Sequence, residues 1–163
     1  MAIFIYPRKT NYYETDRMGV IHHSNYIRYF EEARTALMEQ LGFSYEEMEQ
    51  GGVISPVLEV QCEYRSPVRF GDTVNIAVAV TAYNGFRLHC AYRVTDAASG
   101  ELRTTGTSAH CFLNAEGRPI RLTKLMPRAH ELFRDYAAEC QALGAGGKET
   151  QHGKVHEISD GKL

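Results

Sequence analysis

The hydrophobic pattern of the chain changes once, from a helical period to strict alternation, and this change limits the possible folds more than any other feature. Between residues 24 and 41 apolar side chains recur about every 3.6 residues. They cover much of the helix circumference, at Tyr26, Ile27, Phe30, Ala33, Leu37 and Leu41. The wetter face is marked by Glu31, Glu32, Arg34 and Glu39. A helix with so much apolar surface must be largely buried.

From residue 53 onward apolar and polar residues alternate, which is typical of strands with one buried face. Long strands are predicted over about 53–66, 74–80, 86–94 and 102–113, with an Asn84-Gly85 hairpin between the middle two. A first strand is predicted within residues 2–14, interrupted or begun late because of Pro7. A short helix is expected at 44–50 and a terminal helix over 125–143, starting near Pro127. The fold class is therefore α+β, with a curved antiparallel sheet wrapped around one long helix.

The length of 163 residues suits one domain, which we place at residues 1–142. Residues 143–163 contain few aliphatic side chains, many polar ones and several glycines, so a disordered C-terminal tail is expected there. No window of 18 apolar residues and no secretory pattern occurs. We therefore expect a cytoplasmic protein without a membrane span.

The net charge argues against a nucleic-acid partner, and the cysteine spacing argues against a zinc site. The net charge is −2 and the basic residues are scattered, so a nucleic-acid partner is not expected. The four cysteines, Cys62, Cys90, Cys111 and Cys140, form no C-x-x-C pair, and most lie in apolar segments. They are interpreted as buried hydrophobic residues in a reducing compartment rather than as zinc ligands.

Residues 12–26 concentrate the chemistry, because Asp16, a Gly19 turn, two histidines and a helix start lie close together. No acid occupies the first helical turn, and the N–H groups of residues 23–26 are expected to lack intrahelical partners. These N–H groups could stabilise the negative charge that develops on a carbonyl oxygen placed there. Asp16 could then activate a water molecule or attack the carbonyl carbon directly. The alternative is structural, because an Asp before a turn often bonds to its own backbone.

The same stretch carries a family resemblance. It reads Tyr-x-Glu-Thr-Asp-x-Met-Gly-Val-Ile-His-His-Ser-Asn-Tyr and is followed by Phe30-Glu31-Glu32-Ala33-Arg34. Together with Tyr64 to Asp72, this resembles the 4-hydroxybenzoyl-CoA thioesterase family, in particular its Tol-Pal-associated acyl-CoA thioesterase branch. The resemblance covers about residues 3–138. It implies the hot-dog fold, in which a curved antiparallel sheet surrounds a long helix.

The resemblance also implies roles for individual residues. Asp16 matches the catalytic carboxylate, and His23 matches a position whose backbone N–H polarises the carbonyl; Tyr12 matches a tyrosine implicated in catalysis. Substrate contacts are expected from Gly19, Asn25, Tyr26, Val57, Glu59, Tyr64, Arg65 and Arg69. Val57, Glu59 and Tyr64 are expected to act across a subunit interface, and Arg65 and Arg69 suit a nucleotide phosphate or a solvated strand end. Met18 stands where relatives often have Ala or Gly, and it either narrows the acyl site or packs over it.

The resulting hypothesis is an acyl-CoA thioesterase that needs no metal or prosthetic group, since CoA arrives with the substrate. An acyl carrier protein thioester is an alternative substrate. A homodimer or homotetramer is expected, because a single-layer sheet leaves an open edge strand. Two other functions remain open, a hot-dog enoyl-CoA hydratase or dehydratase and a non-catalytic acyl-CoA binding module.

Overall fold

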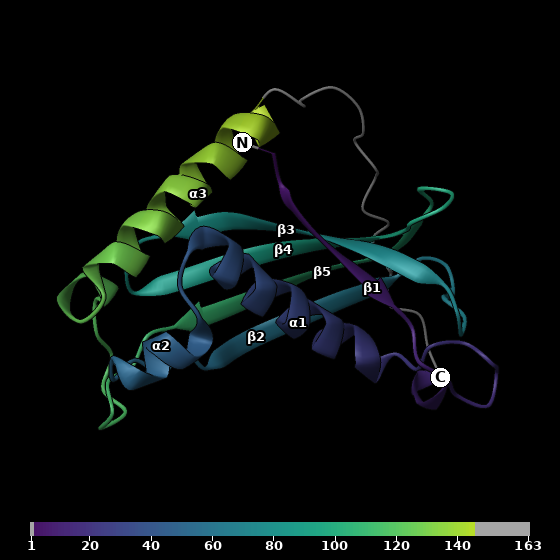
Figure 1. Cartoon of the computed structure of the whole chain (residues 1–163), viewed down its shortest axis with the longest axis horizontal. Helices are drawn as coiled ribbons and strands as arrows, with labels where there is room; N and C mark the ends of the chain where they lie inside the picture. Colours follow the sequence, from purple (N-terminus) through teal and green to yellow (C-terminus); the bar gives the residue numbers. More distant parts are fainter. Residues whose placement is uncertain (1, 146–163) are drawn as a thin grey trace, which may run out of the picture.

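The computed structural model describes residues 2–145, which form one antiparallel sheet crossed by a long helix (Figure 1). The strands are β1 (Phe4–Lys9), β2 (Val57–Tyr64), β3 (Thr73–Tyr83), β4 (Arg87–Asp96) and β5 (Leu102–Cys111), in the order β1-β3-β4-β5-β2. The helices are α1 (Ser24–Leu41), α2 (Tyr45–Gln50) and α3 (Pro127–Ala145), with short 3₁₀ turns η1 (Tyr12–Glu14) and η2 (Leu122–Lys124). The predicted α+β hot-dog fold is confirmed.

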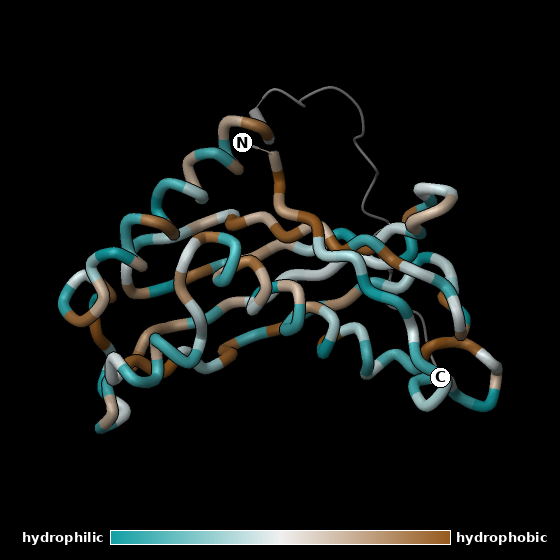
Figure 2. The backbone as a smooth tube through the Cα atoms, viewed as in Figure 1, coloured by the Kyte–Doolittle hydropathy of each residue, from teal (hydrophilic) through white to brown (hydrophobic). Residues whose placement is uncertain are grey.

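The alternating pattern creates one apolar face on the central strands. Alternate residues of β3 and β4 are buried over most of their length, namely Val74, Ile76, Val78, Val80, Leu88, Cys90, Tyr92 and Val94. Hydrophobic residues of α1 and α3 complete this core, and in Figure 2 the turns of α3 alternate between hydrophobic and hydrophilic residues, as one buried face requires. At the centre, Phe30 of α1 stacks on Tyr92 with ring centroids 4.3 Å apart.

A glycine makes room for this central stack. A Cβ built on Gly106 of β5 would overlap the ring of Phe30 and would lie 2.8 Å from the Gln61 carbonyl oxygen. Only a residue without a side chain therefore lets α1 approach the sheet this closely. The sequence pattern did not reveal this requirement, because the close approach involves residues about 75 positions apart.

Three local predictions differ from the structure. β1 continues through Pro7, because β1 is an edge strand, where proline is tolerated. Tyr12 lies in the turn η1 rather than in a strand. Arg34, expected on the wetter face of the helix, is only 9% exposed, because its side chain reaches inward to the hydroxyl of Tyr92.

The C-terminal helix starts at Pro127 as predicted and continues to Ala145, past the expected domain boundary at 142. The predicted disordered tail therefore begins inside α3, and its remainder, residues 146–163, lies outside the described residues. Within residues 2–145, each helix is too short or too polar to cross a lipid bilayer.

Candidate active site

Asp16 occupies a tight loop between η1 and α1. Its backbone N–H donates to the Val20 carbonyl at 2.8 Å, and the Gly19 N–H donates to the Asp16 carbonyl at 3.0 Å. Gly19 has φ +73°, a left-handed conformation that glycine adopts readily. The Oδ1 atom of Asp16 accepts the Met18 N–H at 2.8 Å. One carboxylate oxygen thus stabilises the turn, as the structural alternative predicted, and among the described residues the other oxygen has no hydrogen-bond partner.

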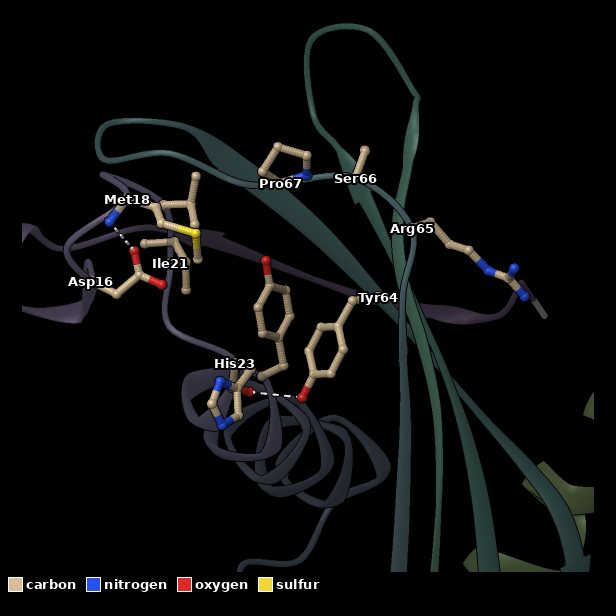
Figure 3. Close-up of a pocket in the computed structure, with 10 residues that line it drawn as sticks. Asp16, Met18, Ile21, His23, Tyr64, Arg65, Ser66 and Pro67 are labelled. Carbon is tan, nitrogen blue, oxygen red and sulfur yellow. Dashed lines mark hydrogen bonds between the residues drawn. The ribbon is translucent and has the colours of Figure 1, made fainter. Parts of the chain in front are cut away.

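This loop forms one side of a pocket of about 290 Å³. Figure 3 shows Asp16, Met18 and Ile21 on one side, His23 at the start of α1, and Tyr64 to Pro67 opposite. The complete lining is Asp16, Met18, Val20, Ile21, His23, Tyr26, Tyr64, Arg65, Ser66 and Pro67. The pocket therefore lies between the Asp16 loop, the N-terminus of α1 and the end of β2.

The start of α1 has fewer free donors than the sequence predicted. Helical structure begins at Ser24 behind an N-cap at His23. The Ser24 N–H donates to Nδ1 of His22 at 3.2 Å, and the Asn25 N–H donates to the His22 carbonyl at 3.0 Å. The Tyr26 N–H makes a longer bond, 3.4 Å, to the His23 carbonyl. Of the four expected donors, only the His23 N–H has no partner among the described residues, because His22 satisfies two of the others.

A buried carboxylate outside the pocket, Glu14, anchors the loop to the fold. Glu14 is 4% exposed and accepts hydrogen bonds from Arg8 of β1 at 2.8 Å and from the Tyr29 hydroxyl of α1 at 2.7 Å. Its own backbone carbonyl accepts the His22 N–H at 2.9 Å and the Asn25 side-chain amide at 3.0 Å. One residue thus ties β1, the loop and the start of α1 together.

The charge state of Glu14 follows from these contacts. Burial alone would raise the pKa of Glu14, but the hydrogen bonds from Arg8, the Asn11 N–H and Tyr29 lower it below its usual value. Glu14 was not among the predicted site residues. A signal was present, because Asn11 and Glu14 have the spacing of a capping box, and the structure contains that box.

Tyr64 connects the pocket wall of β2 to the helix start. Its hydroxyl donates to the His23 carbonyl at 3.0 Å (Figure 3). Partial burial, together with the neighbouring Cys62, raises the pKa of Tyr64, so the hydroxyl remains protonated and can donate. Tyr26, buried beside it, has its ring centroid 5.3 Å from that of Tyr64. The two aromatic rings form an apolar wall next to the His23 backbone.

The structure brings five of the predicted site residues to the pocket, Asp16, His23, Tyr26, Tyr64 and Arg65. Gly19 shapes the loop without lining the pocket, and Asn25 is buried behind it. Arg65 lines the pocket with its stem, while its guanidinium points away and pairs with Glu63 (Figure 3). Arg69 is exposed and forms a β-bridge with Val20 of the loop.

The remaining predicted residues lie elsewhere in the single chain. Tyr12 is 74% exposed and packs edge-on against Phe70, outside the pocket lining. Val57 and Glu59 lie near the beginning of β2, whereas the pocket contains the end of that strand. Their roles stay predictions. Val20, Ile21, Ser66 and Pro67 also line the pocket; they lie within the two stretches that carry the family resemblance but were not predicted as site residues.

The cysteines and other potential metal ligands do not gather at this pocket. Cys62, Cys90, Cys111 and Cys140 are all free thiols. Within the described part of the chain, His, Cys, Asp and Glu side chains form no group of three or more with the geometry of a metal site.

Comparisons with known proteins agree with this architecture. Residues 11–143 match the model of the thioesterase-like superfamily. The provisionally named acyl-CoA thioesterase YneP of Bacillus subtilis (strain 168) is 37% identical over 126 residues, which cover 77% of this chain and 91% of that protein. The acyl-CoA thioester hydrolase YbgC of Escherichia coli O157:H7 is 27% identical over 123 residues, covering 76% of this chain and 92% of that protein.

A solved thioesterase structure is also similar to this chain. The DHNA-CoA thioesterase from Staphylococcus aureus superposes with a TM-score of 0.78 and 35% identity, covering 90% of this chain and 95% of that one. The family match includes the Asp16 loop, the central helix and strands β2 to β5. The chain belongs to the thioesterase-like superfamily.

Proposed function

We propose that this protein is an acyl-CoA thioesterase that hydrolyses a thioester to a carboxylic acid and free CoA, with Asp16 as its catalytic carboxylate. The observation that carries the proposal is the geometry of one pocket. Asp16 and His23 both line it, and within residues 2–145 one oxygen of the Asp16 carboxylate and the His23 N–H make no hydrogen bond. The relatives support the reaction class, because those compared above bear thioesterase or thioester hydrolase names.

The proposed reaction uses these two groups in distinct roles. The Asp16 carboxylate removes a proton from water, and the resulting hydroxide adds to the thioester carbonyl carbon. The carbonyl oxygen becomes an oxyanion and accepts a hydrogen bond from the His23 N–H at the positive end of the α1 dipole. The C–S bond then breaks, the CoA sulfur takes up the proton and the acid is released. A direct attack by Asp16, which forms an anhydride that water then cleaves, stays open as an alternative.

The basic residues near the mouth suit the nucleotide part of CoA. Arg65 and Arg69 are both exposed, and they flank the Ser66-Pro67 segment of the pocket lining. A phosphate is a better partner for Arg65 than its exposed neighbour Glu63, because a phosphate carries more charge. An acyl carrier protein thioester remains an alternative carrier.

We also propose that two copies of the chain pair through β2. β2 is an edge strand bonded on one side to β5, and no other strand of residues 2–145 pairs with its second edge. Three large hydrophobic residues of β2, Val57, Leu58 and Tyr64, are about half exposed. Antiparallel pairing would cover them and would place Val57 and Glu59 of one subunit near the pocket of the other. Light scattering that gives the mass of a monomer would contradict this pairing; a tetramer requires a further interface.

The family branch bears on which acyl-CoA is the substrate. The resemblance of residues 12–34 to the 4-hydroxybenzoyl-CoA and Tol-Pal-associated enzymes supports an acyl-CoA substrate. The structural relative at 35% identity is named as a DHNA-CoA thioesterase. A panel that contains 4-hydroxybenzoyl-CoA, DHNA-CoA and aliphatic acyl-CoAs separates these possibilities.

The decisive experiment measures CoA thiol release from that panel. Asp16→Asn is expected to lower kcat by about a hundredfold or more, because it removes the base and keeps the shape of the side chain. Asp135→Asn is the matched control, since Asp135 is an exposed carboxylate of α3 that pairs with Arg134. Equal rates for wild type and Asp16→Asn would overturn the assignment of Asp16. Water addition to an enoyl-CoA without thiol release would favour a hydratase, and tight binding without turnover would favour a binding module.

A further inference from the structure

Arg34 is a buried cation that the proposed reaction does not use. It lies in the middle of α1, and its Nη1 donates to the Tyr92 hydroxyl at 3.1 Å. A guanidinium has five N–H donors. Among the described residues this is the only hydrogen bond that the Arg34 side chain makes. Its one acidic neighbour in that part of the chain is Glu31, at 4.0 Å, whose carboxylate is largely exposed.

The groups beneath Arg34 are polar but neutral. The Tyr92 hydroxyl bonds to Oγ of Ser108 at 2.8 Å, and Oγ bonds to Nε2 of His110 at 2.7 Å. Burial, with the positive charge of Arg34, lowers the pKa of His110 to about 4, and burial raises the pKa of Tyr92 to about 12. These three hydrogen-bonded side chains fix the position of the guanidinium but supply no negative charge to balance it.

The guanidinium opens into a slot of about 290 Å³, separate from the Asp16 pocket. The slot lies between α1, α2 and the segment before β2, and it is lined by Glu31, Arg34, Thr35, Tyr45, Ser55, Pro56 and Val57. The hydroxyls of Thr35 and Ser55 add potential donors. The Tyr45 hydroxyl donates to the Ser55 carbonyl at 3.4 Å, which connects α2 to the opposite wall.

We propose that this slot is a binding site for a carboxylate, with Arg34 as its charged floor. Buried cations in proteins are normally paired, and a planar guanidinium with free donors matches the two oxygens of a carboxylate. Glu31 stands at the rim and opposes an incoming anion. The volume admits a small organic acid or the end of a larger one.

Two sources can supply such a carboxylate. One is a free organic acid, which includes the product class of thioester hydrolysis. The other is a carboxylate at the far end of an acyl group, and this source rests on the function and the β2 pairing proposed above. Antiparallel pairing sets the beginning of β2 in one subunit opposite the end of β2 in the other, so the slot of one subunit would lie beside the pocket of its partner.

Direct binding tests the site without any assumption about catalysis. Calorimetric titration with benzoate and with glutarate is expected to give saturable binding to the wild type. Arg34→Gln should weaken it by about tenfold or more, since one charge-assisted contact is lost. Glu31→Gln should strengthen it, because a rim charge of the same sign is removed. Glu46→Gln, an exposed change on α2, should leave it unchanged.

Glu31→Gln and Glu46→Gln keep the proposal testable even if Arg34→Gln does not fold. Thermal unfolding establishes that each variant is folded before titration. No saturable binding of either acid, or binding that Glu31→Gln fails to strengthen, would overturn the site.

Kinetics separate the two sources of the carboxylate. Glutaryl-CoA and pentanoyl-CoA differ at the far end of the acyl chain, where the first carries a carboxylate. If the carboxylate belongs to the acyl group, Arg34→Gln lowers kcat/KM for glutaryl-CoA and leaves pentanoyl-CoA unaffected. If the bound carboxylate is a free acid, added glutarate changes the rate of pentanoyl-CoA hydrolysis by the wild type and does not change the rate of Arg34→Gln. If both thioesters and the aromatic acyl-CoAs of the panel stay intact in all variants, the thioesterase assignment fails while the titrations still decide the slot.

Discussion

The hydroxyl of Tyr64, at the end of β2, donates a hydrogen bond to the backbone carbonyl of His23, one residue before α1 begins. This contact joins two parts of the chain 41 positions apart, at the point where the proposed oxyanion would form. The carbonyl and the N–H of His23 belong to the same loop turn, so holding one limits the motion of the other. The edge strand therefore helps to position the backbone donor of the site.

Tyr64→Phe should lower kcat several-fold with little loss of stability. The hydroxyl is partly exposed, so its removal should cost no more than about 1 kcal/mol in unfolding free energy. The effect on rate arises because the His23 backbone loses its restraint. Steady-state kinetics and thermal unfolding measure the two quantities. Tyr13→Phe is the matched control, since that hydroxyl accepts a hydrogen bond from Asn11 and Tyr13 lies outside the pocket lining. Equal effects of both changes on kcat would contradict a role for Tyr64.

Replacing His23 can separate its ring from its N–H. His23 has φ −53°, which is compatible with the fixed φ of proline. His23→Pro should therefore remove the donor without breaking the helix start and should lower kcat by about a hundredfold. His23→Ala keeps the N–H and should retain most of the activity. Circular dichroism confirms that both variants keep their helix content. If His23→Ala loses as much activity as His23→Pro, the ring and not the N–H is the functional group.

Glu14→Gln should lower the free energy of unfolding and make that free energy depend less on pH. Loss of a buried ion-pair partner is expected to cost about 3 kcal/mol at neutral pH. The pKa of Glu14 is lowered in the folded state, so its ionised form stabilises the protein above the unfolded value of about 4.3. That stabilisation disappears as the pH falls through the folded-state pKa.

Urea unfolding measured from pH 7 down to about pH 3 tests this linkage. The stability of the wild type should fall more steeply with acid than that of Glu14→Gln. Glu32→Gln is the control, because Glu32 also pairs with Arg8 but its carboxylate is more exposed. Parallel pH curves for wild type and Glu14→Gln would show that Glu14 contributes no linkage.

Gly106→Ala should destabilise the protein by about 1–3 kcal/mol, because a new methyl group would displace the ring of Phe30 from the sheet. The change in unfolding free energy is measured by denaturant titration. Gly144→Ala is the matched control, since a Cβ at that helical position meets no atom within 4 Å. A Gly106→Ala protein as stable as the wild type would mean that α1 can move away from β5 without cost.

The sequence predicted the fold well wherever a local period decides the structure. Alternation along residues 74–94 and the Asn84-Gly85 turn predicted β3, β4 and their hairpin, and the central helix ends at Gly42 as expected. The resemblance singled out the Asp16 loop, where the structure places a pocket. These features depend on neighbours in the chain, so the residues themselves contain the information.

Tertiary structure decided which of the polar groups are buried, bonded or free. Glu14 and Arg34 look like surface residues in the sequence, yet each is buried because a partner from a distant element, Arg8 or Tyr92, comes within hydrogen-bond distance. Of the four donors expected at the helix start, only the His23 N–H has no partner among the described residues, because His22 accepts from two of the others and the His23 carbonyl accepts from the third. Hydrophobic periodicity determines which face of an element turns inward, whereas hydrogen bonding between distant segments determines which donor or charge remains available for a substrate.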